Sequence, residues 1–169
     1  MQDSVVDCDV LLAAKENIKP LHKGRRATAL SAVFSTPLVR RDMQLTRQRE
    51  AYKQEVKAAL QGADPLTLLN AYDQFINWTI ESYPQGDSAE SGIVELIEEA
   101  TRLLKERHSP SINQNETYLR MWLLYADYIE RPLIVYAFLL TNEIGTEHSA
   151  FYESYADDLE RVKRCGNKG

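Results

Sequence analysis

Apolar side chains recur three and four positions apart along most of the chain, with polar side chains at the positions between them. This period is that of an α-helix with one buried face. No segment shows the strict alternation of a half-buried strand, so a sheet is not expected. The pattern predicts helices over residues 45–61, 65–83, 93–104, 115–129, 132–145 and 146–162.

Residues that favour helix ends stand at most of these boundaries. Asp64 before Pro65 predicts an N-cap followed by a proline in the first helical turn. Asn115 and Thr146 are expected to cap two later helices through their side-chain oxygens. Gly145 is expected to end the helix before it in a left-handed conformation. Helix interiors and helix ends therefore lead to the same assignment.

The short connections between the predicted helices, such as the turn cluster at 84–88, favour antiparallel neighbours. Trp122 and Tyr125, near the start of a helix pair, match the tetratricopeptide repeat pattern loosely. The predicted fold is all-α, with a tetratricopeptide-like, right-handed stack of antiparallel helix pairs over residues 41–165. The concave groove of such a stack usually binds extended peptides or partner helices.

The first forty residues differ in character. Acidic and apolar residues mix over 3–12, Pro20 and Gly24 interrupt the chain, and 27–34 is a second short helical candidate. Residues 1–40 are therefore predicted to form a helix-loop-helix recognition segment ahead of the stack. It has too little apolar surface to fold firmly alone, so we expect it to become ordered on a partner.

The composition favours one globular domain with an appended segment: 169 residues, 44% of them hydrophobic and 27% charged. A net charge of −5 argues against a general nucleic-acid binder. No apolar run approaches the roughly 18 residues of a membrane span, and no signal peptide is expected. Cys8 and Cys165 stand at opposite ends of the sequence, which fits neither a disulfide framework nor a metal site.

The polar residues form no pattern typical of catalysis. The three histidines are scattered, and no pair has the spacing of a zinc site. The acidic pairs 98–99 and 157–158 point in different directions on a helix and are interpreted as solvent-exposed faces. The aromatic residues recur beside aliphatic ones, which predicts core packing, with Tyr83 partly exposed. We expect no catalytic residue, no metal and no cofactor, and hence no enzyme.

Lys15-Glu16-Asn17 is the candidate recognition site. Lys15 offers a cationic donor, Glu16 a carboxylate acceptor, and Asn17 both donor and acceptor groups. Three different polar groups in sequence can address three adjacent sites on a receptor. The alternative is that the tripeptide is only the frayed end of a helix. The Pro-Leu and Gly-Arg pairs that follow in register favour recognition.

Residues 15–25 match the extended pattern Lys-Glu-Asn-x-x-Pro-Leu-x-x-Gly-Arg. With YPQGDSAESG at 83–92 and the stretch 118–159, the chain resembles the spindle checkpoint proteins of the third mitotic-arrest-deficient type and their metazoan pseudokinase relatives. The resemblance covers nearly the whole chain. It implies a non-enzymatic protein that inhibits the anaphase-promoting ubiquitin ligase by posing as its substrate.

In that family the tripeptide occupies the degron site of the ligase's WD-repeat coactivator, and the adjoining helix-loop-helix also contacts a HORMA-domain checkpoint protein. The resemblance implies the coactivator, the HORMA-domain protein and the ligase as partners, with a kinetochore scaffold or another checkpoint partner for the repeats. It also implies a location in the nucleus, at kinetochores in mitosis, and in the cytoplasm. Carried over, Lys15, Glu16 and Asn17 make the blocking contact, with support from Pro20, Leu21, Gly24, Arg25, Arg26 and Leu30.

Two other functions stay open on the sequence. The tripeptide can be a genuine degron on a helical-repeat adaptor, since a degron and a pseudosubstrate present the same residues. The chain can also be the regulatory fragment of a checkpoint kinase whose catalytic part is absent. The family's repeats continue past a helix that here ends near Arg164, so we expect a truncation at that end.

Overall fold

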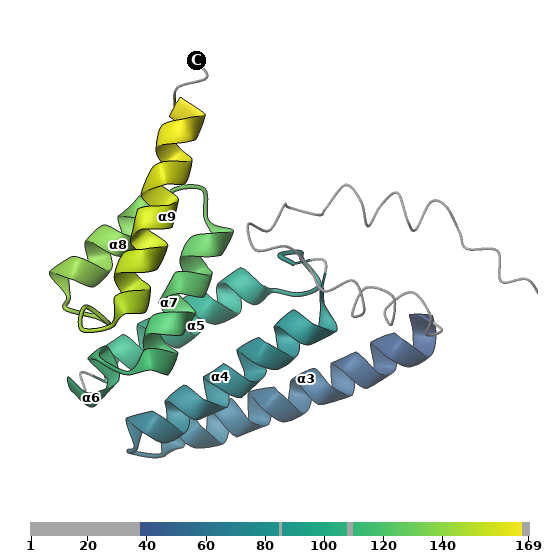
Figure 1. The fold of residues 1–169 in the computed structure, drawn as a ribbon. Coiled ribbons are helices and arrows are strands. Elements are labelled where there is room, and N and C mark those ends of the chain that lie inside the picture. Colours follow the sequence, from purple (N-terminus) through teal and green to yellow (C-terminus); the bar gives the residue numbers. More distant parts are fainter. Residues whose placement is uncertain (1–37, 85, 108–109, 167–169) are drawn as a thin grey trace, which may run out of the picture.

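The computed structural model describes residues 38–84, 86–107 and 110–166. Within these ranges the chain forms seven helices and no strand, which confirms the all-α prediction (Figure 1). The helices are α3 (Leu38–Gln61), α4 (Pro65–Ser82), α5 (Ile93–Glu106), α6 (Pro110–Asn113), α7 (Glu116–Tyr128), α8 (Pro132–Thr141) and α9 (Ser149–Gly166).

Successive long helices pack against one another: α3 on α4, α4 on α5, α5 on α7, α7 on α8, and α8 on α9. Figure 1 shows them reversing direction at each connection, so that α3/α4, α5/α7 and α8/α9 form consecutive pairs. The stack is tetratricopeptide-like, as predicted. The predicted helix-loop-helix of residues 1–40 lies almost wholly outside the described residues.

The first described helix begins earlier than the apolar pattern indicated. α3 starts at Leu38 rather than at residue 45, and the predicted domain boundary between residues 40 and 41 falls inside it. Its first turns are polar and are held by side-chain contacts to α4. The Arg41 guanidinium donates to the Ser82 carbonyl (3.3 Å), and the Trp78 indole donates to Gln48 (3.3 Å). Apolar periodicity does not detect contacts of this kind.

Two predicted N-caps are confirmed. The Asp64 carboxylate accepts from the backbone amides of Leu66 (3.2 Å) and Thr67 (3.1 Å). A hydrogen bond from the Thr67 hydroxyl, with these backbone bonds, lowers the pKa of Asp64. The Asn115 side chain accepts from the Thr117 backbone (2.9 Å). Short polar side chains at these positions satisfy amides that the helix leaves unpaired.

The short helix α6 was not predicted, because one turn cannot display a helical period. It lies between the helices predicted over 93–104 and 115–129, where a helical turn begins at Pro110. Ile112 is its buried residue and fixes this turn against the core. Figure 1 shows α6 just before α7, at one end of the second helix pair.

The end of α8 corrects the role expected for Gly145. The helix stops at Thr141, and Glu143, not glycine, takes the first left-handed position, with a φ of 54°. The Ile144 amide donates to the Leu139 carbonyl (2.9 Å) and the Glu143 amide to the Leu140 carbonyl (3.3 Å), as in a Schellman motif. Gly145 follows in a left-handed conformation of its own, with a φ of 67°.

Thr146 does not cap the last helix, so that prediction was wrong. α9 begins at Ser149, three residues later. His148, just before the helix, is held instead by contact of its Nε2 with the Gln114 carbonyl (2.7 Å). The carbonyl of Thr146 accepts from the Tyr152 hydroxyl (3.0 Å), so Thr146 belongs to the turn and not to the helix.

Replacing Glu143 by glycine is expected to stabilise the fold by about 1 kcal/mol. A left-handed backbone costs a residue with a Cβ roughly 1–2 kcal/mol, and glycine avoids this cost while gaining some freedom in the unfolded chain. Urea unfolding followed by circular dichroism measures the change. Glu147→Gly, at an exposed turn residue outside the left-handed region, is the control and should not be stabilising. A lower midpoint for Glu143→Gly would contradict the assignment.

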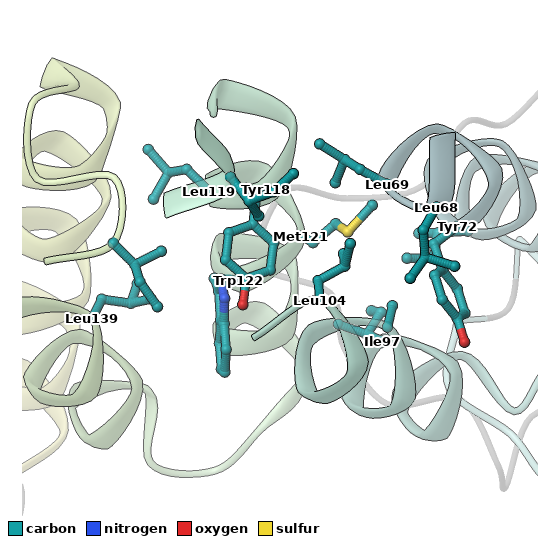
Figure 2. Packing of buried hydrophobic residues seen from close by; sticks show 14 of the residues in the cluster. Leu68, Leu69, Tyr72, Ile97, Leu104, Tyr118, Leu119, Met121, Trp122 and Leu139 are labelled. Carbon is teal, nitrogen blue, oxygen red and sulfur yellow. The ribbon is translucent and has the colours of Figure 1, made fainter. Parts of the chain in front are cut away.

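One hydrophobic core runs through the stack. Figure 2 shows side chains of α4, α5, α7 and α8 meeting between the helices. The aromatic residues are largely part of it, as predicted: Tyr72, Tyr118 and Tyr136 are fully buried. The labelled core residues are Leu68, Leu69, Tyr72, Ile97, Leu104, Tyr118, Leu119, Met121, Trp122 and Leu139.

Candidate docking surface

The recognition residues predicted from the sequence all lie outside the described residues, so their contacts stay predictions. The described helices that follow them include a groove of about 400 Å³ between α3 and α5, which unlike a shallower hollow on the outer face of α3 draws its lining from three helices. We call it the α3–α5 groove. It is lined by Arg49, Lys53, Val56, Lys57, Leu60, Tyr72, Phe75, Ser91, Gly92, Glu95, Leu96 and Glu99. The residues outside are Lys15, Glu16, Asn17, Pro20, Leu21, Gly24, Arg25, Arg26 and Leu30.

One wall of the α3–α5 groove is basic. Arg49, Lys53 and Lys57 are spaced four residues apart on α3, which places them on one face of the helix. Lys53 and Lys57 are exposed. This stripe is not among the residues predicted above as functional, although its i, i+4, i+8 spacing can be recognised in the sequence. Only the tertiary structure places α5 opposite this stripe.

The other wall is acidic and comes from α5. Glu95 and Glu99 line it, and Glu99 accepts a hydrogen bond from the Tyr72 hydroxyl of α4 (2.7 Å). Burial, with the neighbouring Glu99 carboxylate, raises the pKa of Tyr72 well above its usual value, so the phenol stays neutral. The expectation that 98–99 is only a solvated face was therefore incomplete. Glu99 also fixes α4 against α5.

At each end of the α3–α5 groove an arginine side chain donates hydrogen bonds to backbone carbonyls. At one end, Arg49 donates to the carbonyls of Glu90 (2.5 Å) and Ser91 (3.3 Å). At the other end, Arg107 donates to the carbonyls of Leu60 (2.7 Å) and Gly62 (2.6 Å). These contacts join segments more than 40 residues apart and fix the spacing of α3 and α5, because charged donors make the stronger hydrogen bonds.

The connection at 83–92 is ordered by its own side chains. The backbone amides of Ser88 and Ser91 each donate to the other's hydroxyl (3.0 and 3.1 Å). Tyr83 was expected to be partly exposed, but only 8% of its surface is accessible. It packs edge-on against Trp78 at 6.3 Å between ring centroids and lies under the Arg49 guanidinium at 4.9 Å. Tyr83 therefore packs behind the groove and helps to position Arg49, which lines it.

The acidic pair 157–158 is also not simply a solvent face. The side chain of Asp158 is buried, accepts from the Tyr136 hydroxyl (2.7 Å), and pairs with Arg161 (2.8 Å). Burial, together with this carboxylate, raises the pKa of Tyr136 far above its usual range. These contacts connect α8 to α9 at the far end of the stack from the groove.

Tyr136→Phe is expected to cost about 1–3 kcal/mol, because it leaves a buried Asp158 oxygen without its donor. The matched control is Tyr152→Phe at an exposed tyrosine, which should stay within about 0.5 kcal/mol. Urea unfolding at neutral pH measures both. Since the pKa of Tyr136 is raised on folding, the wild-type chain loses stability as the pH rises above about 10, the usual tyrosine pKa, and this loss should shrink in Tyr136→Phe. Equal midpoints for wild type and Tyr136→Phe would contradict this account.

The described residues contain no group of three or more histidine, cysteine or acidic side chains placed to hold a metal ion. No described helix combines the length and apolar character that crossing a membrane requires. What these residues do offer is a groove with a basic wall on α3 and an acidic wall on α5, which suits the binding of a chain segment.

A family model described as Mad3/BUB1 homology region 1 matches residues 47–167. The chain is 33% identical over 156 residues to the mitotic spindle checkpoint component mad3 of Schizosaccharomyces pombe, covering 92% of this chain and 49% of that protein. It is 31% identical to the mitotic spindle checkpoint protein BUBR1 of Arabidopsis thaliana, covering 86% and 35%. It is likewise 31% identical to the human mitotic checkpoint serine/threonine-protein kinase BUB1 beta, covering 87% and 13%.

A similar fold occurs in a chain of a crystal structure of the mitotic checkpoint complex. The TM-score is 0.71 at 33% sequence identity, over 94% of this chain and 72% of that one. The chain thus spans about half the length of the fission yeast relative and a smaller share of the other two.

Proposed function

Because the chain belongs to the Mad3/BUB1 homology region 1 family, we propose that it is a spindle checkpoint component that acts within a mitotic checkpoint complex. Its relatives are named for this checkpoint, and the similar solved chain comes from that complex. In this proposal the helical stack is a binding scaffold with no catalytic role.

We propose further that Lys15, Glu16 and Asn17 occupy the degron site of a WD-repeat coactivator and so keep substrates away from the anaphase-promoting ubiquitin ligase. The observation that supports this is the extent of the likeness to the fission yeast protein. A match over 156 of 169 residues has to begin at or before residue 14, so the matched range includes the tripeptide. The supporting residues Pro20 to Leu30 fall in the same range.

In this proposal the helical stack strengthens binding of the tripeptide by raising its effective concentration at the receptor. A tripeptide buries little surface, so its own affinity is modest. When the stack and the segment before it bind the same assembly, the tripeptide meets its receptor at an effective concentration of roughly millimolar, and avidity rises by about 10²–10⁴. The partners proposed for the linked surfaces are a HORMA-domain checkpoint protein and a kinetochore scaffold.

The same proposal implies a location in the nucleus and cytoplasm, with recruitment to kinetochores in mitosis. Imaging the tagged chain in cells with unattached kinetochores tests this. Diffuse signal throughout mitosis, with the checkpoint active, would argue against a kinetochore role of the stack while leaving the tripeptide mechanism standing.

The test of the mechanism is an ubiquitination assay with coactivator-loaded ligase, a labelled substrate and the HORMA-domain protein. Added wild-type chain should stop substrate modification without being efficiently modified itself. Rapid modification of the chain while the substrate is still consumed would identify the tripeptide as a degron on an adaptor. If the chain binds none of these components and instead binds and regulates a kinase domain, the kinase-fragment function is supported.

A further inference from the structure

The charge on α3 differs in sign from that of the rest of the stack. The helix carries six basic and three acidic residues, whereas residues 62–169 carry nine basic and eighteen acidic ones. Three of the six basic side chains, Arg49, Lys53 and Lys57, line the α3–α5 groove. A negatively charged segment would therefore be attracted to this α3 wall and kept on its side of the groove by repulsion from Glu95 and Glu99 on the α5 wall.

The two lysines are available to a ligand. Arg49 already donates to loop carbonyls, but the described residues include no hydrogen-bond or ion-pair partner for either Lys53 or Lys57. Apolar side chains lie below them in the same groove, among them Val56, Leu60 and Leu96. The surface thus suits a segment that mixes acidic and apolar residues.

The chain itself contains such a segment before α3. Residues 3–12 have three aspartates and no basic residue, and five of the ten are valine or leucine. Asp3 and Asp7 are four positions apart, the same spacing as Lys53 and Lys57. This is the most acidic apolar stretch among the residues that precede α3, since residues 15–26 are net basic.

The connection is long enough for the two to meet. Lys53 lies fifteen residues into α3 from Leu38, about 22 Å at the helical rise. The residues between Leu12 and Leu38 can span up to about 85 Å when extended. An intramolecular contact also begins with an effective concentration of roughly millimolar, so weak complementarity is enough to populate it.

We propose that residues 3–12 dock in the α3–α5 groove, with their aspartates on Lys53 and Lys57 and their apolar side chains over Val56, Leu60 and Leu96. This contact would hold Lys15-Glu16-Asn17 beside the stack, and a partner that takes the groove or the segment would release the tripeptide. The docking is a property of the free chain, so it stands or falls independently of the ubiquitin-ligase mechanism.

The test uses the full chain with a spin label on Cys8, which lies inside the docking segment, and Cys165→Ser to leave one attachment site. Amide signals of Lys53, Val56 and Leu96 should lose intensity, while those of α9 should not. Lys53→Glu with Lys57→Glu should restore the signals. Arg47→Glu, on an exposed position of the same helix outside the groove, is the matched control and should retain the loss.

Salt and labelling patterns separate the alternatives. At 1 M salt the screening length falls to about 3 Å, so the intensity loss should diminish. A loss seen when spin-labelled unenriched chain is mixed with ¹⁵N chain lacking the label would assign the groove to a second copy and overturn the proposal. Intensity loss that is unchanged by the double charge reversal would also overturn it.

A reciprocal label guards against disturbance of the segment by the label at Cys8. With Cys8→Ser, Cys165→Ser and a label on Gln61→Cys at the exposed end of α3, the amides of residues 3–12 should lose intensity. If both labels give no loss, the segment does not occupy the groove.

Discussion

Replacing Lys15, Glu16 and Asn17 together by alanine is expected to abolish inhibition of the ubiquitin ligase while leaving the helical content unchanged. The substitution removes the cationic donor, the carboxylate acceptor and the amide that would address the degron receptor. Linkage to the stack multiplies the tripeptide's effect, so losing it should raise the inhibitory concentration by about 10²–10⁴. The measurement is the dose dependence of substrate ubiquitination, with far-ultraviolet circular dichroism in parallel.

The matched control alters three exposed polar residues on the outer face of α3: Arg47→Ala, Glu50→Ala and Gln54→Ala. It should inhibit as well as the wild type. Retained inhibition by the tripeptide variant would refute the pseudosubstrate mechanism. A collapse of its circular dichroism would show that the tripeptide is structural.

The largest effect on stability is expected from Gly145→Ala, at about 2–5 kcal/mol. A Cβ on the left-handed backbone costs roughly 1–2 kcal/mol, and overpacking a close-packed site costs typically 1–3 kcal/mol more. The added carbon would lie 2.5 Å from Leu119 Cδ1 and 2.9 Å from Leu119 Cγ. These distances are shorter than carbon atoms can approach, so the Leu119 side chain or the backbone would have to move. Leu119 is buried, so it has no free space to occupy instead.

The backbone at Gly145 has little room to adjust either. Its amide donates to the Asn113 carbonyl (2.8 Å), and its carbonyl accepts from the His148 amide (3.1 Å). Urea unfolding measures the loss, and Gly62→Ala is the control, because that glycine has no left-handed φ and its added Cβ would lie 3.4 Å from the Ala59 carbonyl oxygen, an ordinary contact distance. Equal midpoints for Gly145→Ala and wild type would show that Leu119 moves aside at no cost.

Gly145 shows what local sequence signals can and cannot predict. The left-handed backbone of this residue could be predicted from the residue type, but the contact that requires glycine there could not. The end of α8 is made by Glu143, and Gly145 is required because Leu119 of α7 packs on it from 26 positions earlier. A helix-ending rule considers neighbours in sequence and has no information on a contact from another helix.

The α3–α5 groove could not be predicted from the sequence for the same reason. Arg49 and Glu95 lie on helices that line the same groove only after α4 has reversed the chain, and the carbonyls that hold Arg49 belong to residues 41 and 42 positions away. Tyr83 and Asp158 were misjudged in the same way. A tyrosine beside a proline and one of two adjacent aspartates look exposed until the helices that cover them are in place.

The sequence by itself determined the all-α fold, the helix interiors and the caps at Asp64 and Asn115, because burial every third or fourth position and side-chain-to-amide bonds within three residues are local. It also supplied the tripeptide hypothesis, which stays a prediction about residues 15–17. Only the tertiary structure decided which exposed charges face one another across the α3–α5 groove and which polar groups are buried. Those outcomes depend on contacts between helices, whose relative placement a local pattern does not specify.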